Sequence, residues 1–488
     1  MRICLVASEL TPFAKTGGLA DVSTALARHL SRAGHDVLTF LPLYPRCRRP
    51  EWPLQPVEGL VGLEVTFESA HHNFAVYSTP LPAGSAGGEA GPLIYFVDCP
   101  DLFRHDDLYT DDGEEHLRFA LLSRAAIQSC QHLGWAPDVF HCNDWHTGLL
   151  PIYLNTLYEW DRLFANTKTL LTIHNIGYQG VFPIDVIESL GLAESRSLLW
   201  QEDVEQGHIN YLKTGIQYAS HLSTVSETYA SEIQTEEFGN GLESLLTERA
   251  DSLSGIVNGI DFHEWDPAGD EHIASNYSVQ DPSGKVDCKQ ALMEEVGLSY
   301  SDEAPVLGII SRLTGQKGFE LLPDALPIVL QNENVRMVIL GSGEESYEQY
   351  FHWLARTFPD KVHFHCGYDE ALSHRIEAGS DIFLMPSRYE PCGLNQMYSL
   401  RYGSVPLVRL TGGLADTVEG FDPDRSTGTG FVFTEFTSQA FLDTLRFALD
   451  SYRDREAWSA LVRRGMSKDY SWEHQIGEYV RLYESLLG

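Results

Sequence analysis

The chain has 488 residues, too long for one ordinary hydrophobic core, so we expect two large domains. It is 43% hydrophobic and 11% aromatic, a composition that indicates a globular protein and excludes a disordered one. Its 34 basic and 69 acidic side chains give a formal charge of -35, which argues against nucleic acid or an anionic membrane as a general partner.

The cysteines and apolar runs indicate the cellular compartment. The eight cysteines show no C-x-x-C spacing, so we expect reduced thiols rather than disulfides or a zinc site. The first residues enter a strand without the features of a signal peptide. No apolar run approaches the ~20 residues that span a bilayer. We therefore expect a cytoplasmic protein with no membrane or nucleic-acid partner.

Strand-like apolar runs alternate with helical patterns, such as Leu117–Cys130 and Gly148–Leu157, through the first half of the chain. This alternation predicts an α/β domain with a mostly parallel sheet wrapped by helices. A stretch rich in Pro, Gly and Ala, residues 81–91, is predicted to be an exposed loop. The expected strands are Ile3–Ala7, Val37–Leu41, Leu93–Val97, Val139–His141, Leu170–Ile173 and Leu222–Val225.

The second half repeats the same alternation after a turn signal at Asn258-Gly259. We expect domains at 1–255 and 267–471, a crossing at 256–266, and a last helix at 472–488 that returns to the first domain. The polar stretch 275–285 is predicted to be peripheral. The expected strands are Val306–Ile310, Val335–Leu340, Val362–His365, Ile382–Met385, Val405–Val408 and Phe431–Phe433.

One hexapeptide, Thr-Gly-Gly-Leu-Ala-Asp, occurs in both halves, at 16–21 and 411–416, each time after an apolar run. Glycines let a backbone approach a ligand, and the N–H groups of a helix start favour an anion. Lys15 adds a positive charge to the first copy. The alternative is that both copies are only tight turns. The pair favours a phosphate-bearing ligand between two lobes.

Polar residues follow the predicted strands of the second half, and such positions share one crevice at the carboxyl edge of a parallel sheet. Arg312 and Lys317 would place two cations there, matching the two phosphates of a nucleotide diphosphate. They would otherwise be ordinary surface cations. Glu390 could bind sugar hydroxyls or stabilise charge at an anomeric carbon, or could merely cap a helix. Cys392 fits small packing better than a nucleophile.

In the first half, the cluster from His141 to His146 has no zinc-ligand spacing. Asp144 and Trp145 fit a sugar subsite, with a carboxylate for hydroxyls and an aromatic face for the ring, although a buried Trp beside a capped turn is nearly as plausible. His174 follows a strand and turns through glycines. It is either a satisfied core histidine or a substrate contact.

Seven motifs in this order resemble those of bacterial glycogen synthases and plant starch synthases, nearly end to end. They are Lys15–Val22, Asn143–His146, His174–Gly180, Val257–Asp261, Arg312–Gly318, Ser387–Leu394 and Thr411–Val418. The resemblance implies the GT-B fold: α/β, with two Rossmann-like doubly wound domains facing across a deep cleft.

The resemblance also implies a reaction. Such an enzyme transfers glucose from ADP-glucose to the non-reducing end of an α-1,4-glucan, glycogen or starch, with retention at the anomeric carbon and release of ADP. It implies no cofactor and no metal, since cations and oriented N–H groups stabilise the departing ADP. UDP-glucose as the donor stays open.

The resemblance assigns roles residue by residue. The implied catalytic residues are Lys15, His174, Arg312, Lys317 and Glu390. Tyr368 would stack on the adenine, and the His174 carbonyl would lie near the anomeric carbon. The full implied substrate-binding set is Lys15, Gly17, Gly18, Asp21, Asp144, His174, Asn258, Arg312, Lys317, Tyr368, Glu390, Cys392, Gly393, Leu394, Thr411, Gly412 and Gly413. Tyr398 stands where related glycosyltransferases often have a second glutamate, so it receives no catalytic role.

Other functions remain as alternatives. A glucan phosphorylase has a related two-lobe fold but needs pyridoxal phosphate on a lysine, for which no stretch is assigned. A glucan-binding protein without catalysis is disfavoured by Lys15, Arg312, Lys317 and Glu390. A dinucleotide oxidoreductase is the weakest alternative, since Gly341-Ser342-Gly343 lacks the third glycine of the fingerprint.

Overall fold

The computed structural model describes residues 1–67, 70–83, 91–110 and 112–488. The loop predicted at 81–91 therefore falls largely outside the described residues. The described chain divides into two compact units. The first comprises Met1–Val225, Ala230–Gly259 and Trp472–Gly488, and the second comprises Ser226–Tyr229 and Ile260–Ser471.

The first unit is built on a sheet that has ten strands among the described residues. Its parallel part has the order β6-β2-β1-β7-β8-β11-β12, in which β1 is central and the chain order reverses between β1 and β7. These strands are β1 (Arg2–Val6), β2 (Asp36–Pro42), β6 (Leu93–Asp98), β7 (Val139–Asn143), β8 (Lys168–Ile173), β11 (His221–Thr224) and β12 (Leu253–Gly255). All six strands predicted for this half are present.

An antiparallel edge on this sheet was not predicted from the sequence. The long strand β5 (His71–Pro80) pairs antiparallel with β6, and β3 (Gln55–Pro56) and β4 (Leu63–Thr66) pair antiparallel with β5. A separate antiparallel pair is formed by β9 (Val181–Pro183) and β10 (His208–Asn210). These segments are short or half-exposed, so they carry little of the continuous apolar signal of the buried strands.

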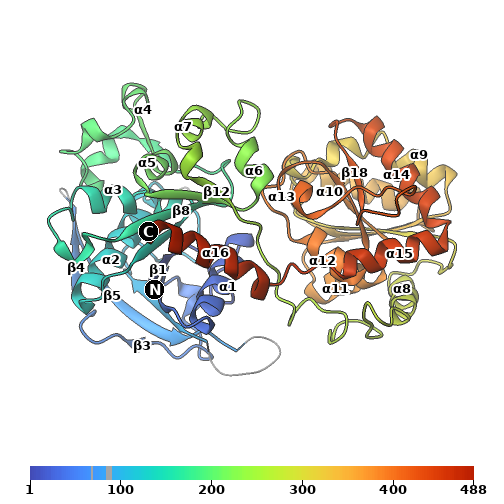
Figure 1. The fold of residues 1–488 in the computed structure, drawn as a ribbon, viewed down its shortest axis with the longest axis horizontal. Helices are drawn as coiled ribbons and strands as arrows, with labels where there is room; N and C mark the ends of the chain where they lie inside the picture. Colours follow the sequence, from blue (N-terminus) through green and yellow to red (C-terminus); the bar gives the residue numbers. More distant parts are fainter. Residues whose placement is uncertain (68–69, 84–90, 111) are drawn as a thin grey trace. The chain divides into compact units, whose positions relative to one another are not determined.

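Helices cover the first sheet, and the chain end is one of them. Helix α16 (Trp472–Leu487), red in Figure 1, packs against α1 (Gly18–Arg32). The Tyr483 hydroxyl lies 2.8 Å from Nδ1 of buried His141 in β7. The predicted helix at 148–157 is shorter than expected. The remaining helices are α2 (Glu115–Leu133), α3 (Leu150–Asn155), α4 (Gln201–Glu205), α5 (Tyr211–Tyr218), α6 (Glu227–Glu232) and α7 (Glu243–Glu248).

The second unit has a parallel sheet of six strands within the described chain, in the order β15-β14-β13-β16-β17-β18. The order reverses between β13 and β16, the point where doubly wound sheets bind ligands. The strands are β13 (Val306–Ile310), β14 (Arg336–Gly341), β15 (Val362–Cys366), β16 (Ile382–Met385), β17 (Val405–Arg409) and β18 (Phe431–Phe433). Each one was predicted from its apolar run.

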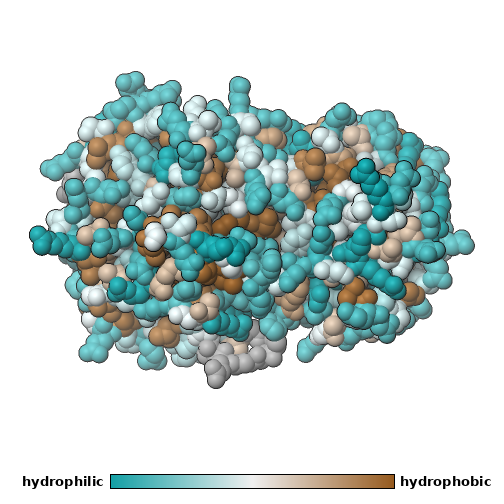
Figure 2. All heavy atoms as spheres, viewed as in Figure 1, coloured by the Kyte–Doolittle hydropathy of each residue, from teal (hydrophilic) through white to brown (hydrophobic). Residues whose placement is uncertain are grey.

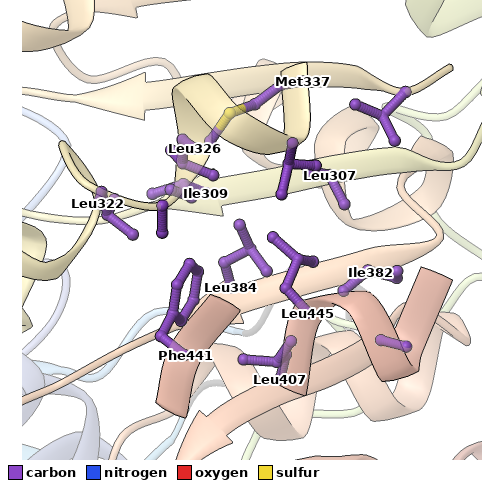
Figure 3. Close-up of a cluster of buried hydrophobic side chains, with 14 of the residues drawn as sticks. Leu307, Ile309, Leu322, Leu326, Met337, Ile382, Leu384, Leu407, Phe441 and Leu445 are labelled. Carbon is purple, nitrogen blue, oxygen red and sulfur yellow. The ribbon is translucent and has the colours of Figure 1, made fainter. Parts of the chain in front are cut away.

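Alternate residues of these strands build two core layers. Leu307 and Ile309 face one layer, with helices α9 (Leu326–Asn332) and α14 (Ser438–Tyr452), as Figure 3 shows. Val306 faces the other layer, with α8 (Gly284–Glu295) and α11 (Glu370–Gly379). This period of two follows from the pleat of a strand. The other helices are α10 (Glu345–Thr357), α12 (Asn395–Tyr402), α13 (Gly412–Thr417) and α15 (Arg455–Met466).

The prediction that 275–285 is peripheral was wrong in part. Tyr277 is buried and donates its hydroxyl to the carbonyl of Tyr402 at 2.8 Å. The Lys285 ammonium donates to the carbonyls of Ala378 and Tyr402, each at 2.9 Å. This polar stretch packs because its polar groups are satisfied by backbone carbonyls, a feature that composition does not reveal.

The outer surface agrees with the composition. Hydrophilic residues cover most of the face in Figure 2. None of the helices in the described part of the chain is both long and apolar enough to span a bilayer. All eight cysteines are free thiols, and Cys366 alone among them is exposed.

Candidate active site

A cavity of about 310 Å³ lies at the carboxyl edge of the second sheet. Its walls come from the segments that follow β13, β14, β15 and β16, the strands around the reversal of strand order. These segments were predicted to share one crevice. The lining residues are Ile310, Ser311, Arg312, Lys317, Phe319, Leu340, Gly341, Ser342, Gly367, Tyr368, Leu384, Met385, Pro386, Ser387, Gly393, Leu394 and Asn395.

A lysine–carboxylate pair stands at this cavity. The Lys317 ammonium lies 2.6 Å from Oε2 of Glu390, and the Ser387 hydroxyl donates to the same oxygen at 2.9 Å. The Glu390 side chain is 6% exposed and that of Lys317 is 20% exposed. A carboxylate so deeply buried needs such partners, since an unpaired charge there is costly. The pair also holds the lysine against the cavity wall.

Arg312 and Tyr368 occupy more open positions on the cavity. Arg312 is an exposed residue just after β13. Tyr368, just after β15, is 80% exposed and lines the cavity, and an aromatic ring in that position suits a planar ligand. The Arg312 guanidinium, the Lys317 ammonium and the Tyr368 ring together suit a flat, anionic molecule such as a nucleotide.

The second glycine turn, residues 411–413, does not line the cavity in the described chain. It packs against the segment that carries Glu390 and Cys392. Gly412 has φ +44, and a Cβ there would lie 1.9 Å from the carbonyl oxygen of Glu390. Gly413 donates its N–H to that oxygen at 3.1 Å, and a Cβ on Gly413 would collide with Cys392. Within the described chain, the Gly413 N–H that the resemblance assigned to a ligand is bonded to backbone carbonyls. Thr411, Gly412 and Gly413 position Glu390 and Cys392.

The first glycine turn, at Thr16 to Gly18, binds the carboxylate of a residue in the same chain, Glu9. The Glu9 carboxylate accepts from the N–H of Thr16 at 2.6 Å and from that of Gly17 at 3.1 Å. The N–H groups of Thr16 and Gly17 are thus bonded to an internal carboxylate, Glu9, which the sequence reasoning missed. Lys15 pairs with Asp21 at 2.7 Å and is half-exposed. A Cβ added at Gly17 or at Gly18 would meet nothing within 4 Å, so the turn borders open space.

Asp144 sits in strained backbone at the end of β7. Its φ of 54 and ψ of -173 fall in a region that non-glycine residues rarely adopt, and such strain concentrates at functional sites. Its carboxyl accepts from the backbone N–H of His174 at 2.7 Å. Burial raises the pKa of Asp144 to about 7, so this carboxyl titrates near neutral pH.

His174 is half-buried and lies beside Asn143 in the same unit. Its Nε2 is 3.0 Å from Oδ1 of Asn143, whose amide already donates to the carbonyl of Val6 at 3.1 Å. Since that Oδ1 can only accept, His174 carries its proton on Nε2 and presents Nδ1 as an acceptor. Burial lowers the pKa of His174 to about 3, so the ring is neutral.

Two further residues singled out from the sequence, Trp145 and Asn258, are buried in the first unit. Trp145 is only 7% exposed and packs edge-on against Phe119, so it is a core aromatic and not an open sugar platform. Gly180 is required beside it, since a Cβ there would lie 2.2 Å from the indole. Asn258 is buried, and its Oδ1 has no hydrogen-bond partner among the described residues.

Comparisons with known proteins indicate one family along the whole chain. The family of the starch synthase catalytic domain matches residues 2–248, and group 1 glycosyl transferases match residues 297–464. Glycogen synthase from Koribacter versatilis is 44% identical over 99% of this chain and 98% of its own length. Glycogen synthase from Anaeromyxobacter dehalogenans is 46% identical over 100% of this chain and 99% of its own.

A comparison with solved structures indicates the same family as the sequence comparisons. The catalytic domain of starch synthase IV from Arabidopsis thaliana, bound to ADP and acarbose, is 33% identical with a TM-score of 0.89 over 99% of both chains. Sucrose-phosphate synthase from Thermosynechococcus elongatus, 15% identical over 99% of this chain and 98% of its own, has a TM-score of 0.59 and shares the fold alone. The α/β fold is of the GT-B type. The chain belongs to the glycogen and starch synthase family, and it is a glycosyltransferase.

Proposed function

We propose that this enzyme transfers glucose from ADP-glucose to the non-reducing end of an α-1,4-glucan, with retention at the anomeric carbon and release of ADP. The observation that carries the proposal is the cavity at the carboxyl edge of the second sheet, where Arg312, Lys317 and Tyr368 meet. The starch synthase of the same fold was solved with ADP and acarbose, which supports a nucleotide here and a glucan acceptor.

In this proposal the cavity binds the donor. Tyr368 stacks on the adenine, and Arg312 and Lys317 bind the diphosphate. When the bond from the anomeric carbon to the diphosphate breaks, negative charge grows on the departing phosphate, and fixed cations stabilise it. The acceptor oxygen forms the new bond to the anomeric carbon, and its proton passes to the departing phosphate oxygen of ADP. Glu390, with Cys392, Gly393 and Leu394, borders the transferred glucose.

Residues of the first unit are proposed to bind the sugars. Asp144, His174 and Asn258 offer hydrogen-bonding groups that suit hydroxyls, and the His174 carbonyl would lie near the anomeric carbon. The orphaned Oδ1 of buried Asn258 supports a ligand that donates a hydrogen bond there. The open space beside Gly17 and Gly18, with Lys15 and Asp21 next to it, supports a contact with the donor glucose and phosphate.

We also propose that the transfer uses no cofactor and no metal ion on the donor, because Arg312 and Lys317 supply the positive charge. Excess EDTA should then leave the initial rate unchanged. Loss of activity that Mg²⁺ or Mn²⁺ restores, with the protein still folded, would contradict this. The eight cysteines form no disulfide, which supports a cytoplasmic location. Glycogen is the proposed acceptor, with neither nucleic acid nor membrane as a partner.

The direct test measures ADP release from ADP-glucose and glycogen. The Lys317→Ala and Arg312→Ala variants should each lose at least about 100-fold in rate, the scale expected for removing one transition-state contact. The matched control is Lys468→Ala, since Lys468 also pairs with a glutamate at 2.6 Å but lies outside the cavity lining. Wild-type rates in Lys317→Ala would refute the proposed role.

The ADP-release assay, a glycogen-binding assay and an absorbance spectrum together separate the alternative functions. Glycogen retention without ADP release would identify a glucan-binding protein, and visible absorbance from bound pyridoxal phosphate would identify a phosphorylase. Comparing initial rates with ADP-glucose and UDP-glucose determines the donor, for which we expect ADP-glucose to be preferred.

A further inference from the structure

Three side chains with metal-ligating atoms meet in the second unit, and none of them lines the cavity in the described chain. They are Glu264, Glu370 and His374, and one ligand atom of each lies within 4.8 Å of the others. Glu370 and His374 are four residues apart on α11, so they share one face of the helix. Glu264 comes from the turn that begins at Asp261.

His374 is oriented as a metal ligand. The ring is 1% exposed, and its Nδ1 lies 2.8 Å from Oδ2 of Asp270. The Tyr402 hydroxyl donates to the same carboxylate oxygen at 2.6 Å. Nδ1 of His374 donates to the Asp270 carboxylate, so in the neutral imidazole the lone pair sits on Nε2.

That lone pair meets no hydrogen-bond donor in the described part of the chain. Nε2 of His374 is buried and makes no hydrogen bond within the described residues. A buried polar atom left unpaired costs free energy, so such an atom points to a missing partner. With Nδ1 bonded to Asp270, Nε2 is the nitrogen left to face the carboxylates. A carboxylate–histidine pair behind a free Nε2 is the usual outer support of a metal-bound histidine.

Ring stacking and an ion pair hold the residues that follow Glu264 in place. The Trp265 ring stacks on His374 and on Tyr398, with ring centroids 3.9 Å apart in each case. The next residue, Asp266, forms an ion pair with Arg401 at 2.9 Å. Glu264 therefore precedes a fixed anchor, and only its exposed side chain must rotate to reach an ion. This limits the conformational entropy lost on binding.

We propose that Glu264, Glu370 and His374 bind a divalent metal ion, with Zn²⁺ preferred and Asp270 orienting the imidazole. One imidazole nitrogen suits Zn²⁺ better than the all-oxygen preference of Mg²⁺ or Ca²⁺. Three protein ligands leave a fourth position for water. The ion also relieves repulsion between the two carboxylates, and it joins the turn at Asp261 to the start of α11. Its role is to stabilise this unit, apart from the chemistry of glucose transfer.

The test measures Zn²⁺ binding to the full chain by calorimetry after treatment with a chelator. All proteins carry Cys366→Ser, which removes the exposed thiol as a competing ligand. The parent should bind Zn²⁺ at one site that Glu264→Gln/Glu370→Gln lacks or binds at least about tenfold more weakly. The control is Glu345→Gln, an exposed glutamate at the start of α10, and it should bind like the parent.

A thermal melt gives a second readout, independent of transferase activity. Zn²⁺ should raise the melting temperature of the parent and of Glu345→Gln, because an ion that binds only the folded state stabilises it. It should not raise that of the double variant. The isosteric glutamine substitutions lie on the surface and keep the fold. Equal Zn²⁺ binding and equal thermal shifts in parent and double variant would overturn the proposal.

Discussion

At the scale of single residues, Asp144 combines strain, burial and a shifted pKa. The positive φ is held because the carboxyl accepts from the N–H groups of His174 and Asn175. Burial nevertheless keeps the pKa near 7, about three units above an ordinary aspartate. The fold therefore favours the protonated acid, which can both donate to and accept from a sugar hydroxyl.

This shift predicts a pH dependence of stability with a definite sign. Between about pH 4 and 7 the folded chain holds a proton on Asp144 that the unfolded chain has lost, so raising the pH lowers the free energy of unfolding by roughly 1.4 kcal/mol per pH unit. The contribution is fully present below about pH 4 and lost above about 7. From pH 5 to 7 the melting temperature of the wild type should fall relative to that of Asp144→Asn.

The control for this comparison is Asp251→Asn, which changes an exposed aspartate of the same unit. It should keep the wild-type pH profile. Identical profiles for wild type and Asp144→Asn would show that Asp144 is ionised throughout this range.

Glu9 shows what sequence patterns leave out at this scale. The glycines, the helix start and Lys15 predicted the phosphate of a ligand at this turn, and the structure shows an internal carboxylate, Glu9, bonded to its backbone. The anion itself, Glu9, lies seven and eight residues before its partners Thr16 and Gly17. Tyr109, far along the chain, donates to the same carboxylate at 2.6 Å. A contact across 100 residues of sequence leaves no local signal.

At the scale of elements, the two copies of Thr-Gly-Gly-Leu-Ala-Asp differ in what their glycines do. In the first copy a Cβ would enter open space, whereas in the second it would strike the carbonyl of Glu390 or of Cys392. The first pair leaves room for something outside the chain. The second pair allows two backbone segments to touch, and so sets the position of Glu390.

Alanine substitutions should therefore affect protein stability differently in the two copies. Gly412→Ala and Gly413→Ala should each destabilise the protein by about 3 kcal/mol or more, since a backbone collision cannot be relieved by a side-chain rotation. Gly18→Ala, at the start of α1, should keep or raise the melting temperature, because alanine favours a helix over glycine. It should still raise KM for the donor. Thermal melts and initial rates measure both effects.

Gly269→Ala is the control, since a Cβ there meets nothing within 4 Å. It should change neither stability nor KM. A stable Gly412→Ala protein would mean that the turn does not define the position of Glu390.

The elements that the sequence predicts and those it misses differ in burial. The twelve predicted strands lie in the parallel parts of the two sheets, and their continuous apolar runs make them visible. The antiparallel strand β5 alternates between buried and exposed residues, and β3 is exposed, so neither forms such a run. Likewise the cavity residues were predicted because they follow buried strands, whereas the packing of Gly413 against Cys392 depends on three-dimensional contact.

At the scale of the whole molecule, the proposed donor site belongs to one unit. Every residue that lines the cavity lies between Ile310 and Asn395, within the second unit. That unit has hydrophobic layers on both faces of its sheet. Its fold and its proposed nucleotide site are therefore expected to be independent of the first unit, while the sugar-binding residues proposed in the first unit are expected to be needed for transfer.

Residues 260–471, produced alone, should fold and bind ADP with an affinity within about tenfold of the full chain, since the same cations and ring are present. They should release no ADP from ADP-glucose and glycogen, because Asp144 and His174 are absent. Calorimetry with ADP and circular dichroism measure binding and folding. The same fragment with Arg312→Ala and Lys317→Ala is the control and should lose ADP binding. A folded fragment that fails to bind ADP, beside a full chain that binds it, would mean that the nucleotide depends on groups outside the cavity.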